Sequence, residues 1–169
     1  IEDYGEDREE PIELANHPKD ETRGIRALTF GREIYIDRAD FAEDPPKGFK
    51  RLVPGGEVRL RGAYVIRCDQ VIKDAEGEVI ELRCSHDAAT LGRNPEGRKV
   101  KGVIHWVPAT SAVTAEVRLY DRLFAVPHPG AGGRDFLNDI NPDSLRTLTG
   151  CLVEPALLAA EPGDRFQFE

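Results

Sequence analysis

The alternation of apolar and polar residues is the main structural signal in this sequence. Residues 33–37, Glu-Ile-Tyr-Ile-Asp, alternate with a period of two, and alternation returns at residues 58–66. A period of two places every second side chain on the same face of a strand, so both segments are predicted to be half-buried strands. Further strands are expected at residues 79–84, 100–107 and 115–119.

Turn signals separate the predicted strands. A glycine-containing turn at residues 74–77 predicts a hairpin, and further turns are expected at residues 94–97 and 127–133. Adjacent prolines make residues 40–48 a loop, because proline lacks the backbone N–H that a strand or helix interior requires. Turns that recur about every ten residues are typical of barrels and sandwiches.

Helical spacing is weak in the chain. It occurs at residues 144–148 and 155–160. The acidic residues 1–24 predict a strand end followed by an exposed loop around Asn16-His17-Pro18, and the alternative is a solvated connector. The fold class is therefore predicted to be all-β, that is, mainly β with short helices.

Length and composition limit the class of protein. The 169 residues suffice for one domain or two small barrels, and a hydrophobic content of 40% is enough to build a core. Because the chain starts at Ile1 and contains no methionine, we expect it to be part of a longer polypeptide. No run approaches the roughly 20 apolar residues of a membrane-spanning helix, so a soluble cytoplasmic protein is expected.

The reactive residues do not form a catalytic or metal-binding pattern. Three dispersed cysteines and four dispersed histidines predict neither a disulfide framework nor a zinc site, and the cysteines are expected to act as small buried hydrophobic residues. The glycine-rich residues 130–133 lack the lysine and hydroxyl residue of a phosphate-binding loop. We therefore predict no catalytic residues and no metal site.

Charge is distributed unevenly. The net charge of the whole chain is −8, and residues 1–24 carry nine acidic and three basic residues, a net charge of −6. Residues 47–67 carry six basic residues and one acidic residue, a net charge of +5. Local charge governs docking at a patch, so the basic segment is a candidate site for a polyanion.

The basic segment has a spacing that suits RNA. Arg59 and Arg61 lie two residues apart on the predicted strand at residues 58–66 and would share one face, and Lys50 and Arg51 precede them by one turn. Aromatic faces are expected nearby from three residues: Tyr35, Phe49 and Tyr64. Unpaired RNA bases are read by aromatic stacking and by arginine hydrogen bonds. The alternative is a solvated strand face without a ligand.

Several segments together resemble a known family. They are residues 33–41, 50–53, 57–61, 99–107, 118–124, 141–145 and 166–169. In this order and spacing they are similar to the carboxy-terminal anticodon-binding region of glutaminyl-tRNA synthetases, which are class I aminoacyl-tRNA synthetases. The resemblance covers essentially the whole chain.

The resemblance implies two linked β-barrels. The proximal barrel would comprise residues 1–45 and 115–169, and the distal barrel residues 46–114. By resemblance, Arg51 would read the third anticodon base with Lys50 supporting the backbone, and Arg59 and Arg61 would serve the first-base pocket. Gln167 would contact the middle uridine, and Lys19 lies near a further position that touches the anticodon loop.

The resemblance also implies a division of labour in a parent enzyme. The parent glutamine–tRNA ligase would use ATP and magnesium in a catalytic domain, whose signature motifs this chain lacks, so this chain would carry no cofactor and no catalytic centre. Its partners would be glutamine tRNA and its own catalytic domain, in a monomer. Two alternatives are the anticodon region of an archaeal or eukaryotic-type glutamyl-tRNA synthetase and a β-barrel module that binds proteins.

Overall fold

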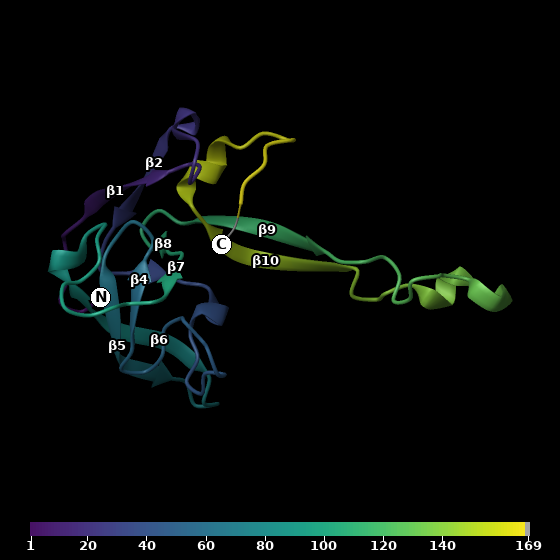
Figure 1. Cartoon of the computed structure of the whole chain (residues 1–169), viewed down its shortest axis with the longest axis horizontal. Coiled ribbons are helices and arrows are strands. Elements are labelled where there is room, and N and C mark those ends of the chain that lie inside the picture. The colour runs from purple at the N-terminus through teal and green to yellow at the C-terminus, as the bar shows by residue number, and fades with distance from the viewer. Residues whose placement is uncertain (168–169) are drawn as a thin grey trace. The chain divides into compact units, whose positions relative to one another are not determined.

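The computed structural model describes residues 1–167 and is mainly β, as the sequence predicts (Figure 1). Its strands are β1 (Glu10–Ala15), β2 (Ile25–Phe30), β3 (Ile34–Tyr35), β4 (Glu57–Leu60), β5 (Val65–Lys73), β6 (Val79–Asp87), β7 (Val103–Ile104), β8 (Val107–Pro108), β9 (Val113–Tyr120) and β10 (Leu145–Val153). Short 3-10 helices are η1 (Glu21–Arg23), η2 (Arg38–Asp40), η3 (Ala88–Thr90), η4 (Ala131–Gly133), η5 (Phe136–Asp139) and η6 (Pro155–Ala159). Within the described residues, no helix is long and apolar enough to cross a membrane.

The chain divides into two compact units. Unit 1 combines Ile1–Ala112 with the segment that starts at Glu154, and unit 2 is Val113–Val153. Closure of the sheets into two barrels stays a prediction.

Unit 1 is built on a four-stranded sheet. Its strand order is β6-β5-β4-β7, in which β4 and β7 pair in parallel and the other neighbours are antiparallel. The strands β1 and β2 form a separate antiparallel pair, and β3 pairs with β8. The predicted hairpin turn lies between β5 and β6, where the Asp74 carboxylate accepts hydrogen bonds from the backbone N–H groups of Glu76 and Glu78 at 3.1 and 2.8 Å.

The core of unit 1 is aromatic. The ring of Phe30 packs edge-on against Tyr4 and Trp106, with centroid separations of 4.9 and 5.3 Å. Tyr4, Phe30 and Trp106 are fully buried, and Tyr64 is 2% exposed. Because Trp106 also donates a 3.0 Å hydrogen bond to the Arg61 carbonyl, its polar N–H is satisfied inside the core.

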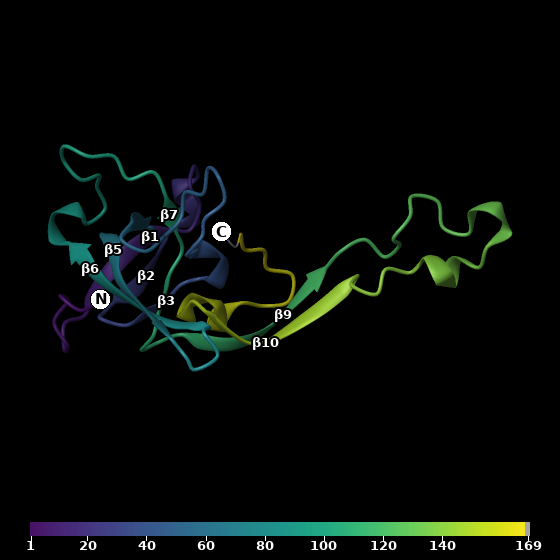
Figure 2. The ribbon, with the colours of Figure 1, turned by 90° about the horizontal axis from the view of Figure 1, so that it is seen from below.

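Unit 2 is a two-stranded ribbon. In Figure 2, β9 and β10 run side by side and continue into the loops that carry η4 and η5. The strands pair antiparallel, with a bulge between Leu148 and Cys151. In the loop region, the carboxylate of Asp139 is 8% exposed and accepts hydrogen bonds from the Gly130 N–H at 2.9 Å and from Arg134 at 3.4 Å.

The predicted strand at residues 58–66 is wrong, because the chain turns in its middle. The strand β4 ends at Leu60, and Tyr64 precedes β5. The backbone N–H of Leu60 donates to the Tyr64 carbonyl at 2.9 Å across the turn. Gly62 has a φ of +68°, and a Cβ there would lie 2.2 Å from a Leu14 methyl carbon, so glycine is required at this position.

The other predicted segments are confirmed in whole or in part. Strands 79–84 and 115–119 are confirmed within β6 and β9, whereas residues 100–107 form two short strands, β7 and part of β8. Residues 33–37 form a strand only at β3, and residues 155–160 form the short helix η6.

One helix prediction is wrong and one strand prediction is confirmed. Residues 144–148 lie mostly in β10 rather than in a helix, whereas the strand end predicted before the loop at residues 16–18 is β1. On β1, Ile12 and Leu14 alternate inward and are 4% and 5% exposed, so this segment contributes to the core.

The cysteines are free thiols. Cys68 and Cys84 are buried opposite each other on β5 and β6, as expected of small hydrophobic residues, whereas Cys151 on β10 is only half-buried. Burial raises the pKa of the Cys84 thiol to about 12 and also raises that of Cys68. Among residues 1–167, no three His, Cys, Asp or Glu side chains gather in a way that could hold a metal ion.

Candidate nucleic-acid interface

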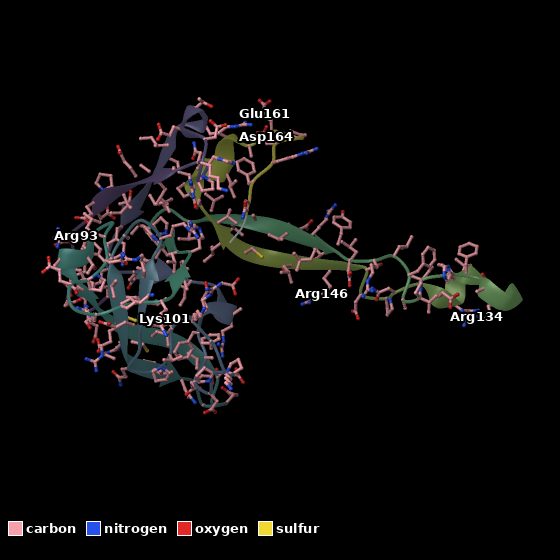
Figure 3. The ribbon with its side chains drawn as sticks, viewed as in Figure 1. Arg93, Lys101, Arg134, Arg146, Glu161 and Asp164 are labelled. Atoms are coloured by element: carbon pink, nitrogen blue, oxygen red, sulfur yellow. The ribbon has the colours of Figure 1, made fainter. Side chains whose placement is uncertain are left out.

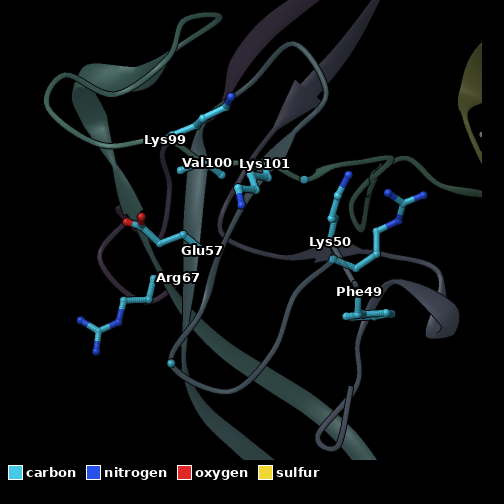
Figure 4. A pocket seen from close by; sticks show the side chains of 10 residues that line it. Phe49, Lys50, Glu57, Arg67, Lys99, Val100 and Lys101 are labelled. Carbon is cyan, nitrogen blue, oxygen red and sulfur yellow. The ribbon is translucent and has the colours of Figure 1, made fainter. Parts of the chain in front are cut away.

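A groove on unit 1 gathers basic side chains from three separate segments (Figure 4). It encloses about 500 Å³ and is lined by Phe49, Lys50, Arg51, Gly55, Glu57, Arg67, Lys99, Val100, Lys101 and Gly102. Half of these residues are lysine or arginine, against one carboxylate. We call this site the basic groove.

Gly102 allows the two walls of the basic groove to approach each other. A Cβ at this position would lie 2.0 Å from the Lys50 carbonyl oxygen and 2.9 Å from a Val58 methyl carbon. The carbonyl of Gly102 accepts a 3.1 Å hydrogen bond from the Arg59 backbone N–H, next to the parallel pairing of β4 with β7. Residues far apart in sequence, Lys50 and Lys101, are thereby brought to the same groove.

Arg51 is held at one side of its guanidinium. Its Nε donates a 2.7 Å hydrogen bond to Oδ1 of Asp40, which lies at the end of η2. The side chain of Asp40 is 12% exposed, whereas that of Arg51 is 45% exposed. Burial raises the pKa of the Asp40 carboxyl, and the hydrogen bond and charge of Arg51 oppose that shift. Arg51 therefore joins a buried anion to an open groove.

Within residues 1–167, the lysines of the basic groove have no acidic partner. Lys50, Lys99 and Lys101 form no ion pair or side-chain hydrogen bond within residues 1–167. The one carboxylate of the lining, Glu57, is engaged by Arg98 Nε at 3.0 Å. Because Arg98 offsets the charge of Glu57, the groove keeps a positive potential that suits phosphate groups.

The structure separates the four cations that the sequence places on one edge. Lys50 and Arg51 line the basic groove, whereas Arg59 turns to the loop after η3, donating to the Arg93 carbonyl at 2.5 Å and to Asn94 Oδ1 at 2.6 Å. Arg61 lies in the turn after β4 and does not line the groove. In Figure 3, Arg93 and Lys101 lie at different places on unit 1. Arg59 lies on β4 and Arg61 lies just beyond its end, so the prediction that one strand carries both residues is wrong.

The remaining candidate residues lie outside the basic groove. Lys19 is exposed in the loop after β1, where its backbone N–H donates to His17 Nδ1 at 3.2 Å. Gln167 is exposed near the end of the described residues. Among the aromatic candidates, Phe49 lines the groove and Tyr35 is 48% exposed. Tyr64 offers no stacking face, because it is buried in the core with its hydroxyl donating to Glu10.

Sequence reasoning assigned no role to three basic residues of the groove, namely Arg67, Lys99 and Lys101, although Arg67 lies in the basic segment at residues 47–67. A signal for two of them is present, because Lys99 and Lys101 lie two residues apart and directly precede Gly102. That pattern predicts two cations beside a close backbone approach. Their proximity to Lys50 depends on the parallel pairing of β4 with β7 and could not be inferred from the spacing alone.

This arrangement is the kind of surface that binds a flexible polyanion. Unpaired lysines attract phosphates, a guanidinium with open donors can bond to a base edge, and an aromatic ring can stack on a base.

Two models of one known protein family match this chain. Both are described as the anticodon-binding domain of class I tRNA synthetases of the E and Q type, and they match residues 1–87 and 103–169. The chain belongs to this family.

Comparison with individual proteins shows which members of this family the chain resembles. The chain is 63% identical to the glutamine–tRNA ligases of Pseudomonas syringae pv. tomato and Pseudomonas putida, and 60% identical to that of Azotobacter vinelandii. Each alignment covers 100% of this chain and 30 or 31% of the relative. The chain thus spans about a third of the length of these relatives. The resemblance to the anticodon-binding region of glutaminyl-tRNA synthetases is confirmed.

Proposed function

We propose that this chain recognises the anticodon loop of glutamine tRNA as the tRNA-binding part of a glutamine–tRNA ligase. The observation that carries the proposal is the basic groove, in which Lys50, Lys99 and Lys101 lack acidic partners within residues 1–167 and Arg51 is oriented by Asp40. The similarity to glutamine–tRNA ligases supports glutamine as the amino acid.

Two kinds of side chain in the basic groove would have different roles in recognition. Lysine carries a compact charge that is not selective among bases, so Lys50, Lys99 and Lys101 would bind phosphates. Arg51 has a planar set of donors that matches a base edge, and the ring of Phe49 supports stacking. Affinity would come mainly from the lysines and selectivity mainly from Arg51.

The other candidate residues would contact the loop outside the basic groove. We propose that Arg59 and Arg61 serve the first anticodon base, Gln167 the middle base, and Lys19 a further point of the loop. A splayed loop suits this separation, because each unstacked base can enter a pocket of its own. The proximal barrel at residues 1–45 and 115–169 and the distal barrel at residues 46–114 are part of the same proposal.

In the parent ligase, the ligation reaction would take place outside this chain. We propose that the remaining two thirds of a protein of the relatives' length holds ATP and magnesium and joins glutamine to the tRNA, while this chain selects the tRNA during translation. The parent enzyme would act as a monomer in the cytoplasm.

Comparative tRNA binding tests the proposal. In filter binding at about 0.1 M salt, the chain should prefer glutamine tRNA over glutamate tRNA, and its affinity should fall steeply as salt rises, because binding releases counterions. The reverse preference would favour a glutamyl-tRNA synthetase. Affinity that is absent, or independent of salt, would favour a protein-binding module and contradict the proposal.

A further inference from the structure

The pairing of Asp40 with Arg51 leaves one edge of the guanidinium open. The hydrogen bond to Asp40 Oδ1 uses only Nε of Arg51. Among the residues that the structure describes, Nη1 and Nη2 of Arg51 have no hydrogen-bond partner. Arginine has five N–H donors in a fixed planar geometry, so holding Nε also fixes the direction of the Nη groups.

Both members of the pair are mounted on a rigid local frame. Leu52, the neighbour of Arg51, donates a 2.9 Å backbone hydrogen bond to the Asp40 carbonyl, and Ala42 donates to the Leu52 carbonyl at 3.2 Å. Phe41 and Leu52 form a parallel bridge and are 5% and 0% exposed. The backbones on which Asp40 and Arg51 sit are therefore fixed to each other and to the core.

The helix that carries Asp40 is also fixed at its start. The carboxylate of Asp37 caps η2 by accepting a 2.7 Å hydrogen bond from the Ala39 N–H. In addition, the Asp40 N–H donates to the Asp37 carbonyl at 3.0 Å. The Asp40 carboxylate thus has little freedom to follow a moving arginine, and it acts as a fixed point for the guanidinium.

We propose that Asp40 is a positioning residue, which holds Arg51 through Nε so that the Nη edge can meet a base that presents two adjacent acceptors. Guanine presents such a pair in O6 and N7, and glutamine anticodons end in guanosine. This inference rests on the proposed function. Asp40 also offsets the charge of Arg51, so Arg51 adds selectivity more than general attraction for phosphate.

The test compares two RNAs and two neighbouring groove residues. The RNAs are the anticodon stem-loop of glutamine tRNA and the same stem-loop with its third anticodon base changed to adenine. Two aligned hydrogen bonds to the correct base correspond to roughly 5- to 150-fold discrimination. In fluorescence anisotropy, the wild-type chain should bind the stem-loop with guanine at the third anticodon position more tightly than the adenine form, by a ratio in this range. Asp40→Asn should reduce this ratio to about 3-fold or less by weakening the binding of the guanine form alone.

Lys50→Ala is the matched control, because Lys50 lines the same groove next to Arg51. It should weaken both RNAs by a similar factor, keep the ratio and reduce the salt slope by about 0.7, the effect of losing one phosphate contact with single-stranded RNA. Asp40→Asn should not reduce the salt slope, because it removes no positive charge. In an Arg51→Ala background, Asp40→Asn should have no further effect on the ratio, since the arginine through which Asp40 acts is gone.

The outcomes separate the inference from the function on which it rests. A wild-type chain that does not distinguish the two RNAs contradicts the assigned role of Arg51. A wild-type chain that discriminates, together with an Asp40→Asn variant that keeps the ratio or loses affinity equally for both RNAs, overturns the role of Asp40. If Asp40→Asn does not fold, Arg51→Lys tests the same geometry with Asp40 intact. This variant keeps the charge but lacks the Nη edge, and a wild-type ratio in it would overturn the proposal.

Discussion

Unit 1 and unit 2 are both built of β-strands, but they bury their side chains to very different degrees. In unit 1, Leu28 and Phe30 are fully buried. In unit 2, Tyr120 is 75% exposed and Leu145 is 48% exposed, although both lie on paired strands. Unit 1 is thus stabilised by a packed core, whereas the two strands of unit 2 are joined mainly through their backbone ladder.

The two units also differ in how they arrange charge. In unit 1, Lys50, Arg51 and Lys101 line one groove although they come from separate segments. In unit 2, Arg134 and Arg146 lie at separate points (Figure 3), and Arg118 pairs with Glu116 on the same strand at 2.7 Å. A packed core can hold cations from distant segments together, whereas a two-stranded ribbon spreads them along its length.

The largest predicted difference between the units concerns stability. Phe30→Ala should lower the free energy of unfolding of unit 1 by about 3–5 kcal/mol, because it removes a fully buried ring. Leu119→Ala, at a side chain that is 44% exposed on unit 2, should change it by about 0.5 kcal/mol or less. Urea denaturation followed by the fluorescence of Trp106 reports on unit 1, because this is the only tryptophan in the sequence. Equal losses in the two variants would contradict the contrast.

The second largest predicted difference between the units is in the reactivity of their thiols. The thiolate is the reactive form, and burial raises the pKa of Cys84 to about 12. At pH 8 a chromogenic disulfide should therefore modify Cys151 of unit 2 at least about 100-fold faster than Cys84. In strong urea all three cysteines should react at similar rates. Fast modification of Cys84 in the folded protein would show that its surroundings are open.

Gly102 tests the close approach that forms the basic groove. Gly102→Ala should lower the stability of unit 1 by about 1–3 kcal/mol and weaken RNA binding, because the new Cβ would overlap the Lys50 carbonyl. Gly31→Ala is the matched control, since a Cβ there would come no closer than 3.9 Å to other atoms outside the adjoining residues. Stability and RNA affinity would be measured for both variants. A Gly102→Ala variant that matches Gly31→Ala in both would argue against the role of this glycine.

The smallest predicted effect is a pH dependence confined to unit 1. Burial alone would raise the pKa of Asp3, but hydrogen bonds from the side chain and backbone of His86 outweigh it and lower the pKa. This stabilisation is present above the ordinary aspartate pKa of about 3.9 and is lost as the pH falls through the lowered value. Asp3→Asn should cost less than about 1 kcal/mol near pH 6, because the side chain is 46% exposed.

A unit 2 carboxylate provides the comparison for Asp3. Asp143→Asn should leave the acid unfolding of unit 1 unchanged, since Asp143 belongs to unit 2. The difference in stability between Asp3→Asn and wild type should disappear as the pH approaches about 2, where the protonated Asp3 of wild type is neutral like the asparagine of the variant. A difference that persists undiminished at that pH would show that the charge of Asp3 is not its cause.

The alternation of apolar and polar residues predicted two strands correctly, at residues 79–84 and 115–119. Residues 79–84 lie within β6, where Cys84 is buried. The prediction failed at residues 58–66, because apolar residues continue through the turn at Gly62 and only the backbone conformation there ends the strand. It also failed at residues 144–148, where Leu145 and Leu148 are exposed on a ribbon and their spacing resembles that of a helix.

The candidate site was predictable in part. Local charge was sufficient to find Lys50 and Arg51, since both lie in one basic segment. The contributions of Lys99, Lys101 and Asp40 depend on which distant segments pair, and local patterns contain no information on parallel pairing between β4 and β7.

One measurement tests the central claim that the basic groove of unit 1 binds the anticodon loop. Two triple variants each remove three positive charges: Lys50→Ala, Lys99→Ala and Lys101→Ala in unit 1, and Arg118→Ala, Arg122→Ala and Arg146→Ala in unit 2. Titrated with the glutamine tRNA anticodon stem-loop at about 0.1 M salt, the unit 1 variant should bind at least about 100-fold more weakly than wild type, with a salt slope reduced by about 2. The unit 2 variant should stay within about 3-fold of wild type. Equal losses in the two variants, or a larger loss from unit 2, would contradict the account.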